Sequence, residues 1–339
     1  TFLLKGWLLR WFGASSAVFP YANEYLSWYL AGTVFSLLSV GMNQFIICQG
    51  FAKVGMKSVV IGAVSNIVLD PVFIFSMHIG VKGAAIATVL SQMASCIYVL
   101  AFLFSDRSLV PITFGGYRGR YMKQVLLVGL SPFLIIASDS VLIIVMNMVI
   151  NAYGKGGRGD MLLTCNTILQ SFMLMITMPL GGITGGTQTV LGYNYGAKRP
   201  DRIRKAQKYI LALGLVFTTI MFIIGQLVPG YFVQIFTRNP AYMEVTQRAI
   251  RVCTMCIIPL AVQYTIVDGF TGMGIARVAV SLSMFRKLIY FLGMLIIPML
   301  FGVESVFFAE PVSDVAACIS SAAAFLLLSG KVLGDNKRL

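Results

Sequence analysis

The sequence predicts an all-α integral membrane protein with about nine transmembrane helices. Of its residues, 58% are hydrophobic and only 11% are charged, whereas soluble domains have roughly 45–50% apolar and about 25% charged residues. The apolar residues also gather into long runs, and a helix needs about 20 such residues to cross a bilayer. These two observations exclude a soluble globular protein.

Nine apolar runs are long enough to cross a bilayer, and together they account for most of the chain. They cover residues 23–49, 58–78, 83–105, 124–152, 161–192, 207–236, 247–270, 278–301 and 312–332. The fifth run is longer than one crossing needs. Pro179, followed by Gly181 and Gly182, gives this run a place to kink, because proline removes a backbone donor.

The net charge of +14 sorts by membrane side, so it does not indicate a nucleic acid partner. Loops on the side reached after the first run hold twice as many Lys and Arg residues as loops on the other side. The densest group lies between the fifth and sixth runs: Lys198, Arg199, Arg202, Arg204, Lys205 and Lys208. This side is therefore predicted to be cytoplasmic, with the C-terminus inside the cell and Thr1 outside.

The chain contains an internal repeat. Gly50-Phe51-Ala52-Lys53-Val54-Gly55 follows the first run, and Gly269-Phe270-Thr271-Gly272-Met273-Gly274 follows the seventh. Gly80-Val81 after the second run parallels Gly302-Val303 after the eighth, and Trp11-Phe12 with Pro20 parallels Ile235-Phe236 with Pro240. Because six runs separate the copies, they cross the membrane in the same direction, which predicts a parallel repeat of six helices.

This repeat predicts three segments. Residues 1–106 are the remainder of an N-terminal lobe, residues 107–123 are a basic cytoplasmic linker with Pro111, Gly115, Gly116 and Gly119, and residues 124–339 are a complete C-terminal lobe. Three further helices are expected to precede Thr1, which agrees with its predicted place outside the cell. The chain is thus expected to be an N-terminally truncated member of a twelve-helix architecture.

The apolar runs contain the acidic residues Asp70, Asp139 and Asp268, and a charge there costs several kcal/mol unless it faces a cavity or a partner. Asp139 is nearest the middle of its run and predicts a Na⁺ or proton site, the alternative being an acid that only packs helices. Asp70 lies one turn from Asn66 and is an ion-site candidate, although Pro71 makes a structural kink the alternative. Asp268 lies near the end of its run, where capping or solvation is expected.

Other polar residues in the runs are candidates for lining a water-filled cavity, the alternative being hydrogen bonds between helices. The cavity and substrate candidates are Asn43, Gln44, Asn66, Asn166, Gln170, Gln188, Asp268 and Arg286. Arg286 and Lys287 lie together inside the eighth run and either snorkel to the surface or pair with an intramembrane acid.

No enzyme signature is present. The sequence has no P-loop, HExxH or GxSxG motif, and its single histidine, His78, cannot serve most acid–base schemes. Its six cysteines lie in apolar runs, where thiols behave as buried hydrophobes. We therefore expect no enzymatic activity, no metal and no cofactor.

Four segments resemble one known family. They are Asn66-Ile67-Val68-Leu69-Asp70-Pro71 with the following Gly80-Val81-Lys82-Gly83-Ala84-Ala85; Gly129-Leu130-Ser131-Pro132 with Asp139 beyond; Gln188 with Gly192-Tyr193-Asn194-Tyr195-Gly196; and Pro311-Val312-Ser313-Asp314. The sequence is similar in these segments to the multidrug and toxic compound extrusion transporters. That family has twelve helices in two six-helix lobes, a transporter fold that agrees with the predicted parallel repeat.

The resemblance implies a secondary active efflux transporter in the cell (inner) membrane. It would export cationic or amphipathic drugs by antiport with Na⁺ or H⁺ and act as a monomer among membrane lipids. A lipid-linked oligosaccharide flippase of the same superfamily is the alternative, but a flippase should line its cavity with several Arg or Lys residues. A non-transporting membrane assembly protein is a third possibility, and it would leave the intramembrane carboxylates without a role.

Overall fold

The computed structural model describes residues 4–11, 19–110, 112–113, 115–116, 118–154 and 158–332, which form helices joined by turns. Eight of these helices are long and apolar enough to cross a membrane, and a bent pair brings the number to nine. The nine predicted runs each correspond to one of these spans, so the all-α membrane fold is confirmed. The helices divide into two compact units, Thr1–Tyr117 and Arg118–Leu339.

The first unit consists of three long helices and two short ones. Its elements are α1 (Lys5–Trp11), α2 (Phe19–Cys48), α3 (Ala52–Pro71), the π-helical turn η2 (Val72–Ser76) and α4 (Val81–Leu103). Polar contacts link the three long helices: Ser39 Oγ of α2 lies 2.8 Å from Ser95 Oγ of α4, which donates to the carbonyl of Ser58 in α3 at 2.9 Å. Such hydrogen bonds replace the hydrophobic effect that helices lose in lipid.

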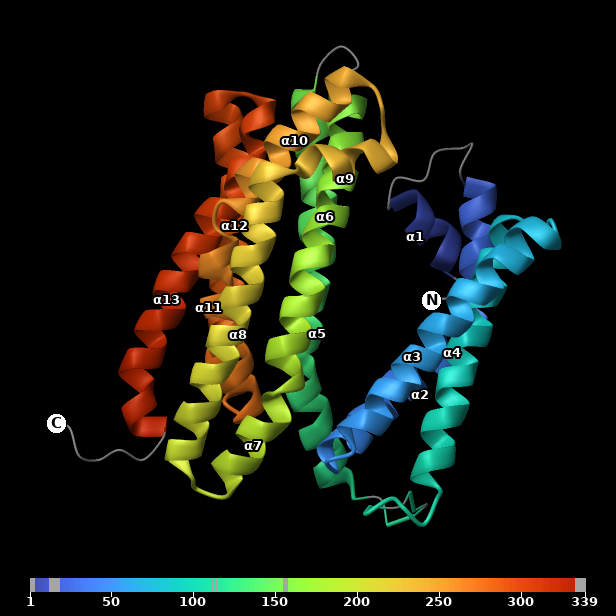
Figure 1. Ribbon diagram of the computed structural model, residues 1–339, viewed down its shortest axis with the longest axis vertical. Helices are drawn as coiled ribbons and strands as arrows, with labels where there is room; N and C mark the ends of the chain where they lie inside the picture. Colours follow the sequence, from blue (N-terminus) through green and yellow to red (C-terminus); the bar gives the residue numbers. More distant parts are fainter. Residues whose placement is uncertain are drawn as a thin grey trace. The chain divides into compact units, whose positions relative to one another are not determined.

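The second unit is a bundle of long helices that run side by side (Figure 1). Its elements are α5 (Gly119–Tyr153), α6 (Arg158–Gly186), α7 (Gln188–Gly196), α8 (Pro200–Leu227), α9 (Pro229–Phe236), α10 (Pro240–Thr254), α11 (Ile257–Gly272), α12 (Ala276–Phe301), the 3₁₀ turn η3 (Val303–Phe308) and α13 (Ala309–Val332). Helices α10 and α11 meet at a bend of 49° and together make the ninth candidate span.

Two predicted runs are interrupted where the sequence analysis did not place a break. In the fifth run, α6 continues through Pro179, and the helix is interrupted two turns later at Thr187. In the sixth run, α8 ends at Leu227, and Pro229 begins a separate short helix. A proline at the first position of a helix costs nothing, because that N–H has no partner in any case.

The structure also corrects the register of the repeat. Helix α2 ends with Gly50 N–H donating to Ile47 and Phe51 N–H donating to Ile46, and α11 ends with the same pair of bonds at Gly274 and Ile275. Both glycines have positive φ, +91° and +77°, as this type of helix end requires. Gly50 therefore corresponds to Gly274 rather than to Gly269, whereas the pairing of Gly80 with Gly302, both also at positive φ, is retained.

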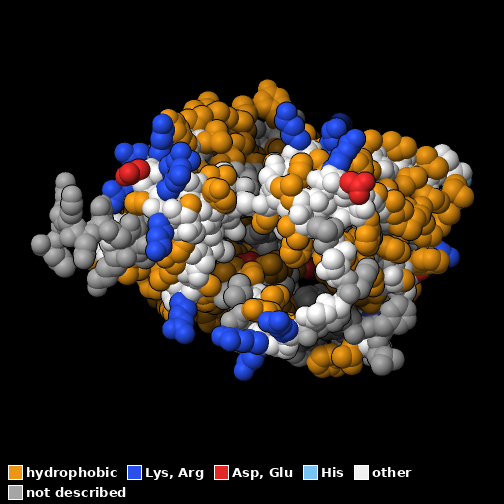
Figure 2. Space-filling model, turned by 90° about the horizontal axis from the view of Figure 1, so that it is seen from below, with side chains coloured by type: hydrophobic (Ala, Val, Ile, Leu, Met, Phe, Trp, Pro, Cys, Tyr) orange, Lys and Arg blue, Asp and Glu red, His pale blue; other side chains and the backbone are white. Residues whose placement is uncertain are grey.

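Basic side chains gather at the α7–α8 end of the second unit. In Figure 2, which views the end where α7 meets α8, Lys and Arg side chains are more numerous than Asp and Glu side chains. The predicted group from Lys198 to Lys208 is exposed here. Thr1, Phe12 and Pro111, which also entered the sequence predictions, lie outside the described residues.

Candidate functional site

The second unit encloses a cavity of about 510 Å³ between α5, α6, α11, α12 and α13. We call it the inner cavity. Its lining combines apolar side chains with an unusual number of polar ones for the interior of a membrane bundle. The polar lining residues are Asp139, Asn147, Asn166, Thr167, Gln170, Thr177, Tyr264, Arg286, Lys287, Tyr290 and Glu310.

Asp139 lies in this cavity as one half of an ion pair. Lys287 Nζ donates to Asp139 Oδ1 at 2.6 Å and also to the backbone carbonyl of Ile135, one turn earlier in α5. The Asp139 side chain is 56% exposed, whereas that of Lys287 is only 10% exposed. The lysine is thus held by α5 from a buried position, while the carboxylate can still be reached from the cavity.

Arg286, the neighbour of Lys287, pairs with acids on the other side of α12. Its Nε donates to Asp314 Oδ1 at 2.8 Å, and its Nη2 lies 3.9 Å from Glu310 Oε1. Asp314 is fully buried, and its second oxygen, Oδ2, has no hydrogen-bond partner among the described residues. Of the two alternatives for Arg286 and Lys287, pairing with an intramembrane acid is therefore the one that the structure shows.

The sequence analysis missed Glu310 because it began the ninth run at residue 312, and it did not single out Asp314, which lies at the start of that run. The helix begins earlier, at Ala309, where it approaches α12 closely: a Cβ built on Gly293 would lie 3.1 Å from the Cβ of Ala309. This contact brings the first turn of α13 to the level of Arg286. The sequence contained a signal for this pairing. Glu310 and Asp314 are spaced i, i+4 and so share a helical face, and Arg286 lies within the preceding apolar run.

Two of the predicted polar residues, Asn166 and Gln170, line the inner cavity with Asp139. They lie one turn apart on α6. Asn166 is only 6% exposed, and its amide oxygen has no partner among the described residues. The cavity therefore contains a buried acceptor that is not satisfied by the protein itself.

Asp268 and Gln188 lie elsewhere in the second unit and do not line this cavity. Thr184 Oγ1 donates to Asp268 Oδ2 at 2.5 Å, and Gln188 Nε2 donates to Asp268 Oδ1 at 3.0 Å. These donors lie on either side of the interruption at Thr187, so Asp268 ties α6 to α7. The expectation that Asp268 caps its own helix or is merely solvated is wrong.

The remaining predicted residues belong to the first unit. Asn43 is buried and accepts a hydrogen bond from Ser58 Oγ at 3.1 Å, whereas Gln44 is exposed. Asn66 Nδ2 and Asp70 Oδ1 are buried atoms without partners in the described part of the chain. Pro71 ends α3 and is followed directly by the π-helical turn η2. The helix is therefore distorted at Pro71, which agrees with the structural alternative for Asp70.

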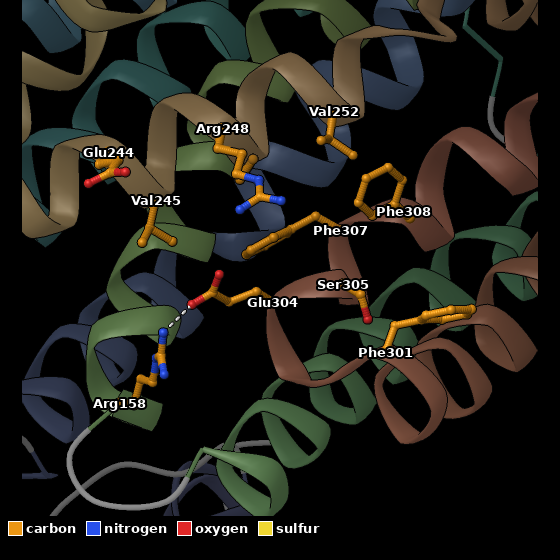
Figure 3. A pocket seen from close by; sticks show the side chains of 11 residues that line it. Arg158, Glu244, Val245, Arg248, Val252, Phe301, Glu304, Ser305, Phe307 and Phe308 are labelled. Atoms are coloured by element: carbon orange, nitrogen blue, oxygen red, sulfur yellow. Dashed lines mark hydrogen bonds and ion pairs between the residues drawn. The ribbon is translucent and has the colours of Figure 1, made fainter.

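A second charged pocket, of about 350 Å³, lies at the other end of the second unit from the basic α7–α8 turn (Figure 3). We call it the outer pocket. Arg158, at the start of α6, donates to Glu304 of η3 at 2.7 Å, and the two side chains are 62% and 34% exposed. Glu244 and Arg248 of α10 also line it, as do Phe301, Phe307 and Phe308.

A polytopic helical bundle with paired charges around an intramembrane cavity is typical of membrane transporters, and comparison with known proteins identifies the family. A profile of the MatE family matches residues 1–72 and 135–296, which is more than half of the chain. The chain therefore belongs to the MatE family, the multidrug and toxic compound extrusion transporters, as the resemblance of its motifs indicated.

The chain is similar to the multidrug export proteins MepA of two staphylococci. It is 22% identical over 299 residues to that of Staphylococcus haemolyticus (strain JCSC1435), covering 87% of this chain and 63% of the relative. With that of Staphylococcus aureus (strain NCTC 8325 / PS 47) it is 21% identical over 332 residues, covering 96% of this chain and 72% of the relative. The chain thus spans about two thirds of the length of these exporters.

Solved structures show the same fold. The outward-facing form of a multidrug resistance MATE family transporter of the MOP superfamily has a TM-score of 0.88 at 23% identity, covering 98% of this chain and 74% of that one. A MOP superfamily transporter from Pyrococcus furiosus, whose reversed pocket polarity is said to suggest a different function, also has a TM-score of 0.88 at 23% identity. Its coverage is 100% of this chain and 75% of that one.

Proposed function

We propose that this protein is a secondary active multidrug efflux transporter that exports cationic or amphipathic compounds by antiport with Na⁺ or H⁺. The observation that supports this most directly is the inner cavity, where an accessible carboxylate, Asp139, lies among polar and aromatic side chains inside an apolar bundle. Intramembrane ionisable residues usually mark ion or substrate pathways. The similarity to multidrug export proteins, rather than to enzymes, agrees with this proposal.

Asp139 is the group that we assign to the coupling cation. Its carboxylate is held by Lys287, so an arriving Na⁺ or proton, or a cationic substrate, must compete with the lysine for the same oxygen. Asp70, in the first unit, is the second candidate, because its buried Oδ1 has no partner in the described residues. Two ligands that compete for one carboxylate satisfy the basic requirement of antiport, since binding of one favours release of the other.

The surroundings of Asp139 suit an amphipathic cation. Tyr264 and Tyr290 border the inner cavity, and aromatic rings attract a positive charge. A second, mostly apolar pocket of about 610 Å³ lies between α5 and α12 and shares Leu142 and Lys287 with the inner cavity. A substrate with one charged and one apolar part can therefore place each part in matching surroundings.

The charge distribution supports an orientation in the cell (inner) membrane. The exposed basic residues at the α7–α8 turn lie at one end of the bundle, and positive residues favour the cytoplasmic side. In this proposed orientation the outer pocket faces the outside of the cell and the C-terminus faces the cytoplasm. We expect the transporter to act as a monomer on small-molecule substrates.

The test is dye efflux from proteoliposomes that contain the purified protein, driven in separate arms by a Na⁺ gradient and by a pH gradient. In the Asp139→Asn variant we expect the gradient-driven component to fall at least tenfold, because the amide keeps the shape of the side chain but loses its charge. Asp160→Asn is the matched control, since Asp160 is an exposed acid at the start of α6. Gradient-driven efflux that is equal in the two variants would rule out Asp139 as the coupling site.

The flippase alternative is less well supported. A flippase needs free cations to hold a pyrophosphate, but the two cations that line the inner cavity, Arg286 and Lys287, are both in ion pairs with acids. In these ion pairs the three acids, Asp139, Glu310 and Asp314, outnumber the two cations. Export of a cationic dye without any movement of a lipid-linked sugar would separate the two functions.

A further inference from the structure

We propose that Glu310 and Asp314 together hold one proton, which makes this acid pair a proton-binding site of the inner cavity separate from Asp139. The inference starts from the charges of the cluster. Asp139 and Lys287 balance each other, but Glu310 and Asp314 share the single guanidinium of Arg286. One negative charge therefore remains inside the bundle.

The geometry shows how unequally Arg286 is shared. Asp314 has the short contact of 2.8 Å to Nε, whereas Glu310 lies 3.9 Å from Nη2, which is beyond a hydrogen bond. Asp314 also has a fully buried oxygen, Oδ2, without any partner in the described residues. Two carboxylates one turn apart on the same helix, which share one guanidinium in a buried place, cannot both stay ionised at low cost, and sharing one proton is the usual solution.

A proton suits this site better than a metal ion. Na⁺ needs several oxygen ligands around it, but the guanidinium of Arg286 occupies one side of the pair and would repel a second cation. A proton needs only one carboxylate oxygen. Glu310 lines the inner cavity, so a proton from cavity water can reach its oxygen and leave by the same route, with the carboxylate becoming a carboxylic acid and then a carboxylate again.

An independent observation points to the same cavity. Asn166, which lines the cavity together with Glu310, is 94% buried, and its amide oxygen has no partner among the described residues. An unsatisfied acceptor of this kind indicates a ligand or a water that donates a hydrogen bond. Water held at Asn166 would provide the medium through which protons reach the acid pair.

Other titratable or charged groups face Glu310 or line its cavity, and the pH dependence of the site includes their effects. They are Arg286 and Tyr290 on α12, Lys287 on α12, Asp314 on α13, Cys253 on α10, Tyr264 on α11 and Asp139 on α5. Among them, Arg286 and Lys287 are the cations, and each already has an acid as its partner. None of these groups removes the excess acid.

The test is infrared difference spectroscopy on the purified full chain, comparing neutral and alkaline pH. We expect a carboxylic acid C=O band at neutral pH that disappears at alkaline pH. The band should be lost in Glu310→Gln, which preserves the size of the side chain, and should shift or disappear in Asp314→Asn. It should persist in Glu304→Gln, the matched control, because Glu304 is paired with Arg158 in the outer pocket.

A band that is unaffected by both cavity variants would overturn the proposal. Loss of radioactive sodium binding in Glu310→Gln would do the same, because the site would then hold a metal ion. The use of this proton in transport rests on the proposed antiport, but its binding does not. If the band depends on Glu310 but the wild-type protein and its variants export no dye, the proton site is supported and the proposed function fails. If the wild-type protein exports dye but the band does not depend on Glu310, the proposed function is supported and the proton site fails.

Discussion

The second unit has two charged pockets, and they differ in how their charges are satisfied. In the outer pocket, Arg158 and Glu304 form an ion pair whose side chains are 62% and 34% exposed, so water solvates both charges. In the inner cavity, Arg286 is paired with Asp314, and the side chains are only 20% and 0% exposed. Similar residue types therefore have different energetic roles in the two places.

This difference separates charges that membrane insertion tolerates from charges that it penalises. A charge at the end of a helix can stay hydrated, whereas one inside the bundle must find a partner or a cavity. The inner charges are also coupled through α12, since Arg286 binds acids on α13 while Lys287 binds α5. Removing a charge should have an effect that increases with its burial.

The largest effect is expected for Arg286→Met, which leaves Glu310 and Asp314 without a cation. Breaking a buried ion pair by removing one partner usually costs about 3–5 kcal/mol, so the melting temperature of the detergent-solubilised protein should fall sharply. The loss should shrink as the pH is lowered, because protonation neutralises the two acids. Thermal unfolding at several pH values measures both effects.

Arg277→Met is the control for this variant. Arg277 lies on the same helix, α12, but is exposed, so the same change of residue should leave the melting temperature nearly unchanged. Equal stability of the two variants would mean that the Arg286 pair does not stabilise the inner cavity. Addition of Asp314→Asn to Arg286→Met should restore part of the loss.

A smaller effect on stability, but a clear effect on ion binding, is expected for Lys287→Met. Because Asp139 is 56% exposed, its carboxylate can remain solvated, and the loss of the pair should cost ~1 kcal/mol or less. Without the lysine, a cation no longer has to compete for Asp139. The Na⁺ concentration that drives half-maximal dye efflux should therefore fall, while Lys287→Arg should preserve the wild-type value. An unchanged value in Lys287→Met would show that the lysine does not compete with the coupling ion.

Much of the fold could be predicted from the sequence, because apolar runs report directly on bilayer crossings. The nine runs match the described spans, and the break at Val228 was missed because the residues around it remain apolar on both sides. The composition of an apolar run does not indicate where the backbone hydrogen bonds of its helix are interrupted. The register of the repeat was misjudged for a related reason: both copies contain several glycines, and only the positive φ of Gly50 and Gly274 shows which correspond.

The candidate site was predicted less completely. Asp139 was found because it lies in the middle of an apolar run, where any charge is conspicuous. Glu310 lies at the edge of a run, where an acid normally remains solvated, so its place in the cavity depends on how closely α13 packs against α12 at Gly293. Which acid pairs with which base depends likewise on helix packing, which one sequence does not specify.

The smallest effect is expected for Arg158→Gln in the outer pocket. Exposed ion pairs contribute about 0–1 kcal/mol, so the melting temperature and the gradient-driven efflux should both stay close to those of the wild type. A double-mutant cycle with Glu304→Gln isolates the coupling between the two side chains from their other contacts. A coupling well above ~1 kcal/mol would contradict the comparison, because α6 and η3 would then be locked together by a pair that water does not weaken. The outer pocket would in that case resemble the inner cavity in energy as well as in composition.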